Sequence, residues 1–391
     1  MQRIALLIDT ATSWGAGLIE GIAAYAKDQR LSWLFSIEPR GKYEPMMLPE
    51  GWRGAGVIAR VTHSGLAEQL IAQRIPAVNV SWFSYGENLI PRCTCDEVAS
   101  GELAADYYLQ NGYRQFAYCG STIRPSYNDR LGAAFREAVE KAGCPCHTFL
   151  PDRDRFATLD SESQLKELSA WLAGLPRPTA LLAFDSIQGR QVTEACAQTG
   201  LVVPDDIAVL GGEHDELCSR VSSPPLSGID QSPGEVGFRA AEMLHQQMNG
   251  QRPAESDLRV PPRRVITRQS TDKVAIGDEM LAEALRYIRE HCSEQLHIRD
   301  ILQAVPLSRR ALEIGLRTYL GRTPREEIRR IRVEKAVELL CDTDMPITKI
   351  AMACGFDRPE LLTRAFRREL DATPSQFRKR LVEQRAAAEA V

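Results

Sequence analysis

Two groups of arginine in the last third of the chain have the chemistry needed to bind a nucleic acid. The first group lies between positions 309 and 317 and the second between 358 and 368, each mixed with acidic or hydroxyl side chains. Arginine makes bidentate hydrogen bonds to phosphate oxygens and to base edges in the major groove. The candidate nucleic-acid contacts are Arg309, Arg310, Glu313, Arg317, Arg358, Glu360, Thr363, Arg364, Arg367 and Arg368.

The arginines belong to a segment that occurs twice. Five residues of 312–324 recur at an offset of 50, whereas upstream residues recur at 49, so the second copy has one extra residue in its turn. Apolar residues at i, i+3 and i+4 predict a short helix, a turn and a longer helix in each copy. Each longer helix should bury one stripe and leave its arginines on the outer face, as major-groove reading requires. The predicted stripes are Leu312, Leu316 and Leu320, then Leu362, Phe366 and Leu370.

Helix-capping residues support this duplicated pattern. Ser308 and Asp357 are the predicted N-caps of the two longer helices. Thr323 and Glu326 form a capping box with Pro at the first helical position, and a similar pattern begins at Thr373. Between the copies the sequence predicts a helix of roughly 18 residues, about 27 Å long. Such a helix can hold two reading helices about one DNA turn apart.

These motifs resemble the DNA-binding domain of AraC/XylS-type transcription regulators, over about 278–381. One departure lies in the first of the longer helices, where Ile314-Gly315-Leu316 replaces the two basic residues and Phe that are usual in the family. Ile314 offers no hydrogen-bond donor at a position that family members use to contact bases, and a glycine inside a helix costs about 1 kcal/mol relative to Ala. We therefore expect the first reading helix to be weaker or less specific. The motifs that carry the resemblance are Ser308-Arg309-Arg310-x-Leu312-Glu313, Gly321-x-Thr323-Pro324, Ile350-Ala351-x-x-x-Gly355-Phe356 and Arg364-x-Phe366-Arg367-Arg368.

The charge of the chain is distributed unevenly. Of its 391 residues, 1–272 contain 26 Lys and Arg against 33 Asp and Glu, while 273–391 contain 22 against 19. An acidic body with a basic C-terminal part fits nucleic-acid binding confined to that part. The sequence has no signal peptide and no run of 18 apolar residues, so we predict a cytoplasmic protein without membrane contact.

The cysteines and the N-terminal glycines give no sign of a bound metal or cofactor. Ten cysteines without a secretory signal are expected to be reduced thiols. The pairs at 93/95 and 144/146 lack a His or a further Cys at zinc-site spacing. The glycines at 15, 17 and 21 are spaced G-x-G-x-x-x-G rather than as a dinucleotide-binding loop. We therefore predict no metal and no cofactor.

The first 250 residues alternate between strand-like and helix-like segments. Short apolar runs such as Ile4–Ile8, Gly56–Val61 and Thr179–Phe184 are typical of parallel strands covered on both faces. Strands that alternate with helices predict a doubly wound α/β fold. About twelve such elements precede residue 250, which favours two parallel sheets of similar size over one.

Three segments resemble the two-lobed sugar-binding domain of LacI/GalR-type repressors and periplasmic binding proteins. Joined to an AraC-type domain, it is the architecture of the bacterial xylose-operon regulators. The resemblance implies a monosaccharide effector, D-xylose or a similar sugar, double-stranded operator DNA, a homodimer, and RNA polymerase as a partner if the protein is an activator. The segments are 203–211, 224–229 and 264–271.

In such folds the ligand binds between the lobes, beyond the carboxyl ends of the strands. Polar and aromatic residues follow the predicted strands here, and they suit a sugar because Asp and Arg bind vicinal hydroxyls and an aromatic ring stacks on the sugar ring. Each one could instead cap a helix or face solvent. The candidate ligand-binding residues are Asp9, Thr10, Ser13, Trp14, Arg130, Asp185, Glu213, His214 and Asp215.

The sequence thus predicts a two-lobed effector-binding domain over 1–270, a linker over 271–277 and a DNA-binding domain over 278–391. We expect a sequence-specific transcription regulator in which a ligand closes the lobes. One alternative is a regulator that senses redox state or a metal through its cysteines. Another is a sugar- or nucleotide-active enzyme, which is disfavoured because the chain has no phosphate loop, no Gly-x-Ser-x-Gly and only six His.

Overall fold

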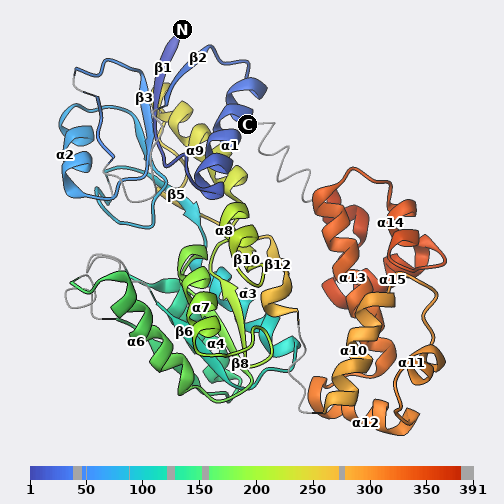
Figure 1. The fold of residues 1–391 in the computed structure, drawn as a ribbon. Helices are drawn as coiled ribbons and strands as arrows, with labels where there is room; N and C mark the ends of the chain where they lie inside the picture. The colour runs from blue at the N-terminus through green and yellow to red at the C-terminus, as the bar shows by residue number, and fades with distance from the viewer. Residues whose placement is uncertain are drawn as a thin grey trace. The chain divides into compact units, whose positions relative to one another are not determined.

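The described residues of the computed structural model form two compact units, one made of residues 1–109 and 114–272 and the other of residues 110–113 and 278–379 (Figure 1). Of the predicted linker, only residues 271 and 272 are described, and residues 380–391 of the predicted DNA-binding domain also lie outside the description. The described residues are 1–37, 46–49, 51–87, 89–120, 128–151, 158–272 and 278–379.

The first unit contains two six-stranded sheets, so the predicted α/β class with two sheets of similar size is confirmed. The strand orders are β11-β5-β4-β3-β1-β2 in the first lobe and β12-β10-β9-β8-β6-β7 in the second. The strands are β1 (Gln2–Leu7), β2 (Trp33–Ile37), β3 (Gly56–Ala59), β4 (Ala77–Asn79), β5 (Arg92–Cys95), β6 (Phe116–Cys119), β7 (Cys146–Phe149), β8 (Thr179–Ala183), β9 (Ile207–Gly211), β10 (Ser227–Asp230), β11 (Asp257–Val260) and β12 (Arg264–Ile266).

Helices connect most of these strands, and paired strands run parallel except for β10 with β12. The strand residues of β1, β3, β6, β8 and β9 are largely buried because helices cover both faces, as Figure 1 shows. The helices are α1 (Ser13–Asp28), α2 (Ser64–Ala72), α3 (Glu97–Gln110), α4 (Arg130–Lys141), α6 (Ser161–Ala173), α7 (Ser186–Gln198), α8 (Glu216–Val221), α9 (Pro233–Met248) and the short 3-10 helix η1 (Gln269–Thr271).

Three strands, β5, β11 and β12, were not predicted because they lack an apolar run. Arg92 in β5 makes two hydrogen bonds of 2.8 Å to the carboxylate of Asp257 in β11. Charged residues therefore pair across these strands where apolar residues would otherwise pack. The predicted strand Gly56–Val61 was also too long, since β3 ends at Ala59.

Two glycines of α1, Gly17 and Gly21, are explained by close packing against α9. A Cβ on Gly21 would lie 2.0 Å from the carbonyl oxygen of Gly234, and one on Gly237 would lie 2.1 Å from that of Leu18. A Cβ on Gly17 would meet the ring of Pro233 at 2.8 Å. These glycines let two helix backbones approach, which is a structural reason for their spacing.

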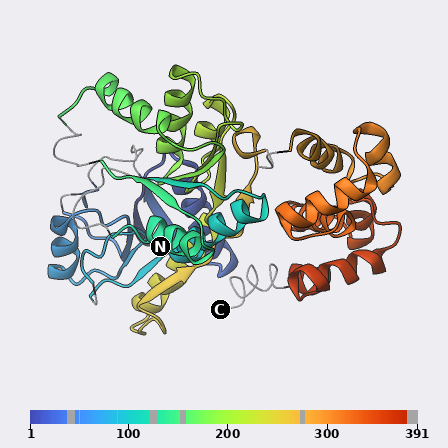
Figure 2. The same ribbon diagram turned by 90° about the horizontal axis from the view of Figure 1, so that it is seen from below.

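The second unit is helical and contains the predicted duplication (Figure 2). The first copy is α11 followed by α12 and the second is α14 followed by α15, with 7 and 12 residues in the respective helices of both copies. Each copy has its own apolar core, and α13 contributes to both cores. The helices are α10 (Glu279–His291), α11 (Ile298–Ala304), α12 (Arg309–Leu320), α13 (Pro324–Asp342), α14 (Ile347–Ala353) and α15 (Pro359–Leu370).

The prediction that Asp357 caps the second long helix is wrong. Ser308 does cap α12, accepting from the N–H of Ala311 at 3.1 Å, but α15 begins at Pro359 and Arg358 occupies its N-cap position. Proline is favoured at the first helical position and keeps the preceding residue extended. Asp357 is therefore the extra residue of the second turn.

The prediction that Leu370 is buried is also wrong, since its side chain is 42% exposed. It is the last residue of α15, and Asp371 behind it adopts a left-handed conformation (φ 50°). The end of this core is closed instead by Phe377, whose ring centroid lies 5.5 Å from that of Phe366. The two predicted capping boxes are both present, at Thr323 and Thr373.

Gly21→Ala should destabilise the first unit. The new Cβ would overlap the backbone of α9, and overpacking of this kind costs about 1–3 kcal/mol or more. Gly174→Ala is the matched control, because its Cβ would come no closer than 3.5 Å to its nearest neighbour. Scanning calorimetry of the full chain should show a lower transition temperature for Gly21→Ala alone. Equal transition temperatures would contradict the close packing of α1 on α9.

Candidate nucleic-acid interface and effector site

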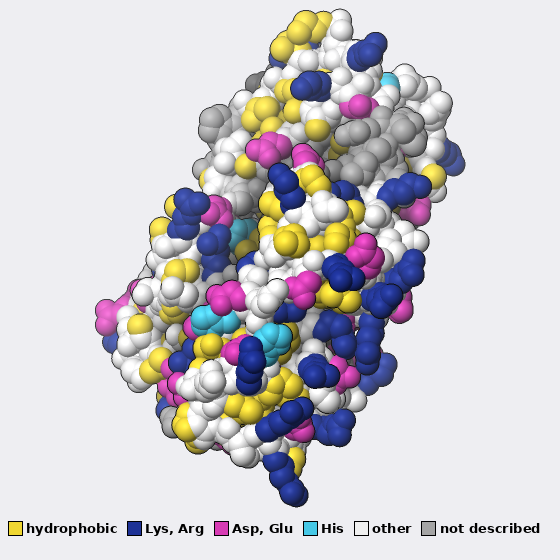
Figure 3. Space-filling view, turned by 90° about the vertical axis from the view of Figure 1, so that its right-hand side faces the viewer, with side chains coloured by type: hydrophobic (Ala, Val, Ile, Leu, Met, Phe, Trp, Pro, Cys, Tyr) yellow, Lys and Arg dark blue, Asp and Glu magenta, His cyan; other side chains and the backbone are white. Residues whose placement is uncertain are grey.

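The first reading helix, α12, buries one side and exposes the opposite one. Leu312, Leu316 and Leu320 are buried as predicted, whereas Arg310 and Arg317 are exposed. Lys and Arg side chains gather along one side of the molecular face drawn in Figure 3. A buried apolar stripe with arginines on the opposite face is the distribution that a helix needs to enter the major groove and contact phosphates beside it.

The glycine in this helix has a packing role. A Cβ on Gly315 would lie 2.7 Å from Cδ2 of Leu281, so its absence lets α10 approach α12. The neighbouring Ile314 is 54% exposed. The segment Ile314-Gly315-Leu316 therefore leaves α12 intact as a helix and makes its outer face apolar at position 314.

The second reading helix, α15, exposes Glu360, Arg364 and Arg367. Thr363 is half-buried, and its hydroxyl donates to the carbonyl oxygen of Pro359 at 3.1 Å. Arg358, just before this helix, is exposed. These side chains occupy positions from which a recognition helix contacts DNA.

Two of the predicted contacts are paired with acidic residues of the same unit. Arg309 donates from Nε to Glu313 at 2.9 Å. Arg368 lies 3.3 Å from Glu326 of α13 while remaining 63% exposed. Exposed ion pairs of this kind are weak, so both arginines can still exchange their partner for a phosphate.

The helix α13 contains a buried ion-pair cluster near its start and makes a half-buried ion pair with the second copy. Glu327 is only 1% exposed, and Arg330 donates to both of its carboxylate oxygens at 2.7 and 3.1 Å. Arg322 donates to the same carboxylate at 3.1 Å. Arg329 donates to Glu369 of α15 at 2.5 Å. A buried carboxylate with two guanidinium partners holds α13 against its neighbours.

Further contacts of α13 and of the loop after α10 reach the turn of the second copy. Arg332 donates to the carbonyl oxygens of Cys292 and Glu294 at 2.7 Å each, and its guanidinium lies 5.6 Å from the ring centroid of Phe356. Gln295 also donates to Asp357 at 3.0 Å. The loop after α10 is therefore fixed to the turn of the second copy. This contact holds the two reading helices in a fixed orientation relative to each other.

In the first unit, Asp9 forms the centre of a buried polar group at the end of β1. Arg60 donates to one carboxylate oxygen of Asp9 at 2.7 Å and Thr12 to the other at 2.5 Å. The guanidinium of Arg60 lies 5.6 Å from the ring centroid of Trp14 and 6.0 Å from that of Trp82. A charged pair beside two indole rings matches the polar and aromatic chemistry that a sugar requires.

Arg60 and Trp82 were missed in the sequence. Arg60 follows β3 directly and Trp82 follows β4, so both lie at carboxyl ends of strands. The prediction that β3 continues to Val61 placed Arg60 inside a strand. A lone arginine in an apolar run and a tryptophan just after a short strand were the signals that could have found them.

The second lobe contributes Asp185 and Glu213, which are 3% and 4% exposed. Asp185 caps α7 and accepts from the N–H of Gln188 at 2.7 Å. Glu213 lies 3.5 Å from the hydroxyl of Ser186. The ring of Phe184 meets that of Trp82 edge-on at 5.8 Å, which brings the strand ends of the two lobes together.

Ser13 and Asp215 contact each other across the lobes. The N–H of Ser13 donates to Asp215 at 2.8 Å, and the hydroxyl of Ser13 accepts from the N–H of Glu216 at 2.9 Å. Asp215 also caps α8 through the N–H of Cys218 at 2.8 Å. Burial by itself raises the pKa of Asp215, but the hydrogen bonds donated by Cys218 and Ser13 hold that pKa below its usual range. We call this reciprocal pair of bonds the lobe clasp.

The other predicted ligand contacts are placed differently. His214 lies 3.2 Å from Glu216, which also accepts from Arg268 at 2.9 Å. Thr10 is half-buried after β1. Arg130 begins α4, is exposed, and makes no side-chain hydrogen bond or ion pair with any residue that the structure describes. The structure thus brings together Asp9, Ser13, Trp14 and Asp215, while the ligand-binding role of Arg130 stays a prediction.

Three chain segments cross between the lobes, after β5, β10 and β11, and hydrogen bonds link them. Asp96 donates its N–H to the carbonyl oxygen of Val260 at 2.7 Å. Gln231 accepts from the thiol of Cys95 at 3.4 Å and donates to the carbonyl oxygen of Gly212 at 2.8 Å. The crossing segments therefore form a hinge that is connected to the end of β9.

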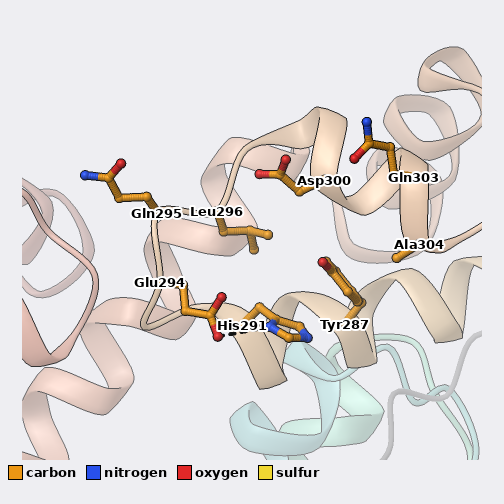
Figure 4. A pocket seen from close by; sticks show the side chains of 8 residues that line it. All are labelled: Tyr287, His291, Glu294, Gln295, Leu296, Asp300, Gln303 and Ala304. Carbon is orange, nitrogen blue, oxygen red and sulfur yellow. Dashed lines mark hydrogen bonds and ion pairs between the residues drawn. The ribbon is translucent and has the colours of Figure 1, made fainter.

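A groove of about 380 Å³ lies beside α10 and α11 in the second unit, and Figure 4 shows its lining. Tyr287 and His291 have ring centroids 4.3 Å apart, and His291 lies 3.1 Å from Glu294. These side chains therefore interact with one another across the groove lining. The groove shows no convergent set of groups for a ligand.

The cysteines give no support to metal or redox sensing. All ten are free. Burial raises the pKa of the Cys95 and Cys196 thiols to about 12 and that of Cys354 to about 11. Thiolates are the form that binds metals and reacts with oxidants. Within the described ranges, no three His, Cys, Asp or Glu side chains gather in a way that could hold a metal ion.

Among the helices described, none is both long enough and apolar enough to cross a membrane.

Comparison with known proteins identifies two domains. Residues 105–271 match the family model of a periplasmic binding protein-like domain, and residues 301–380 match that of a helix-turn-helix domain. The first match spans the second lobe together with α9 and β11 of the first lobe, and the second match covers the duplicated helices of the second unit.

Similarity to individual relatives extends over nearly the whole chain. The xylose operon regulatory protein of Haemophilus influenzae is 26% identical over 381 residues, which cover 96% of this chain and 98% of that protein. The protein of the same name from Escherichia coli K12 is 27% identical over 388 residues, covering 96% and 97%. The solved structure of the xylose-binding transcription activator xylR matches with a TM-score of 0.59 and 26% identity, covering 97% of this chain and 98% of that one.

Arg364→Ala should weaken binding to the preferred DNA duplex by about 1–3 kcal/mol and relax selectivity at one or two base pairs, because a base-reading side chain is lost. Arg286→Ala is the control, since Arg286 is an exposed arginine on α10, outside both reading helices. Fluorescence anisotropy with single-substituted duplexes measures both effects. An equal loss for every duplex, with a shallower salt dependence, would show that Arg364 contacts only phosphate.

Proposed function

We propose that this chain, a sugar-responsive DNA-binding transcription regulator of the xylose-operon type, controls a carbohydrate-utilisation operon in response to D-xylose or a related pentose. The observation that supports the sugar most is the buried pair of Asp9 and Arg60 beside Trp14 and Trp82. The relatives named for xylose share both domains with this chain in the same order.

The chemistry of this group suits a polyhydroxylated ring. A guanidinium carries five N–H donors and an ionised carboxylate has about four acceptor sites, so Arg60 and Asp9 can bind hydroxyls while keeping their own bond. The indole N–H of Trp14 is buried without a hydrogen-bond partner among the described residues, and it offers a further donor. Asp185 and Glu213 approach from the second lobe with two more carboxylates.

Ligand binding then acts through the relation between the lobes. A sugar that contacts strand ends of both lobes binds the closed form better and increases its population. The lobe clasp supports that form without ligand, and the hinge at Gln231 allows the change. The protein acts as a cytoplasmic homodimer, because lobe closure can alter the spacing of DNA-binding units only when two chains are joined. RNA polymerase is a further partner if the regulator activates transcription.

D-xylose should bind the full-length protein with measurable heat, and Asp185→Asn should weaken this binding at least tenfold, about 1.4 kcal/mol. Asparagine keeps the N-cap of α7 but removes the charge that would accept a sugar hydroxyl. Asp160→Asn is the matched control, because Asp160 caps α6 in the same way, accepting from Ser163 at 2.7 Å. Titration calorimetry measures all three proteins.

Two results would count against this proposal. Absence of heat and of any thermal shift with pentoses and hexoses at millimolar concentration would reject a sugar effector. Equal affinities for the wild type and Asp185→Asn would keep the sugar but remove Asp185 from its site.

Ser13→Ala should open the lobes of the sugar-free protein and weaken sugar binding by up to about fivefold, since one hydrogen bond contributes roughly 1 kcal/mol. The hydroxyl of Ser13 is half of the lobe clasp. Ser222→Ala removes a hydroxyl bonded at 2.6 Å to Cys218 within one lobe and serves as control. Fluorescence energy transfer between dyes on the two lobes reports the opening. An unchanged lobe separation would show that the clasp contributes nothing to closure.

A further inference from the structure

The two reading helices present different chemistry at matching positions. Both helices have 12 residues, and their caps differ by 50 positions, so each outer-face residue of α12 has a counterpart on α15. Only the last of the four outer-face pairs has the same residue in both helices. The pairs are Arg310 with Glu360, Glu313 with Thr363, Ile314 with Arg364, and Arg317 with Arg367.

Glu313 stands out because it is the only acid in α12. The buried stripe at Leu312 and Leu316 turns Glu313 outward, and its side chain is 46% exposed. Arg309 donates to its Oε1 at 2.9 Å, one turn towards the N-terminus of the helix. This bond orients the carboxylate and leaves Oε2 as an acceptor on the outer face.

The major-groove edges of the bases decide what such an acceptor can bind. Cytosine presents its N4 amino group as a donor, whereas guanine presents two acceptors, and the amino group of adenine lies next to the acceptor N7. A carboxylate is therefore matched best by cytosine. Next to it, Ile314 exposes an apolar side chain, and the only apolar group in the major groove is the C5-methyl of thymine.

We propose that Glu313 selects cytosine in the part of the operator read by α12 and that Ile314 packs on a thymine methyl there. The part read by α15 then differs, because Arg364 and Arg367 match guanine. One chain thus recognises two unlike subsites, and its first reading helix is specific despite having no donor at position 314. This inference rests on the proposed DNA-binding function.

The competing explanation is that Glu313 only pairs with Arg309 on a solvated face. An exposed pair of residues i and i+4 contributes little to helix stability, so stability does not require an acid here. On this explanation the carboxylate only repels phosphates. Its removal would then strengthen binding to every duplex alike, which separates the two explanations.

The test uses the full-length protein and a library of duplexes with a randomised core, from which bound sequences are enriched and read. The wild type should enrich a site with a fixed cytosine, and Glu313→Gln should enrich adenine at that position, since glutamine pairs with adenine. Preference for cytosine there should fall at least tenfold. Glu290→Gln, which removes an exposed acid of α10, is the control and should keep the wild-type site.

A second measurement tests Ile314 without changing the fold. Replacing the proposed thymine by uracil in the enriched duplex removes only the methyl group. Wild-type affinity should fall several-fold, whereas Ile314→Ala should bind both duplexes alike. Equal wild-type affinity for the two duplexes would overturn the role of Ile314.

Uniformly tighter binding by Glu313→Gln, with an unchanged enriched sequence, would overturn the selection of cytosine. The same holds if Glu290→Gln and Glu313→Gln behave identically. Failure of the wild type to enrich any sequence would instead contradict the proposed function, so the two failures remain distinguishable.

Discussion

The DNA-binding unit is built around α13, the helix that contributes to the apolar cores of both copies and contains one buried carboxylate. Glu327 is almost fully buried in α13 and accepts from both Arg330 and Arg322. A charge taken out of water is tolerated only when it is paired, and loss of one partner of a buried pair typically costs about 3–5 kcal/mol. Arg322 thereby fixes the turn before α13 to this helix, while Arg329 and Arg332 extend from α13 to the second copy and to the loop after α10. Two reading helices on one rigid frame can address two consecutive major grooves.

In the sensor unit, the contacts between the two lobes are weaker than the buried ion pairs of the DNA-binding unit. Its lobes are joined by three crossing segments and by contacts of modest strength, the lobe clasp and the edge-on pair of Trp82 and Phe184. A few hydrogen bonds make only a small free-energy difference between the open and closed forms. A ligand with contacts to both lobes can therefore shift their populations. The strong pair, Asp9 with Arg60, lies within one lobe and therefore does not resist opening.

Local spacing in the sequence was enough to predict the duplicated helices, their caps at Ser308 and Thr323, and the two parallel sheets. The errors occur where a boundary depends on a neighbour. Pro359 sets the start of α15 and displaces Asp357 from the cap position. Arg60 and Trp82 join the site because β3 ends at Ala59 and β4 at Asn79, and the apolar run of 56–61 gave a strand that was two residues too long. The lobe clasp joins residues about 200 positions apart, which sequence spacing alone does not reveal.

Coupling between sugar binding and DNA binding can be measured directly on the full-length protein. Binding free energies are reciprocal, so if D-xylose changes operator affinity by some factor, operator DNA must change D-xylose affinity by the same factor. Calorimetric titration of D-xylose with and without saturating operator duplex gives this factor. We expect operator DNA to change the affinity for D-xylose by roughly 5-fold or more, as is typical of allosteric coupling. Identical sugar affinities in the two titrations would contradict it.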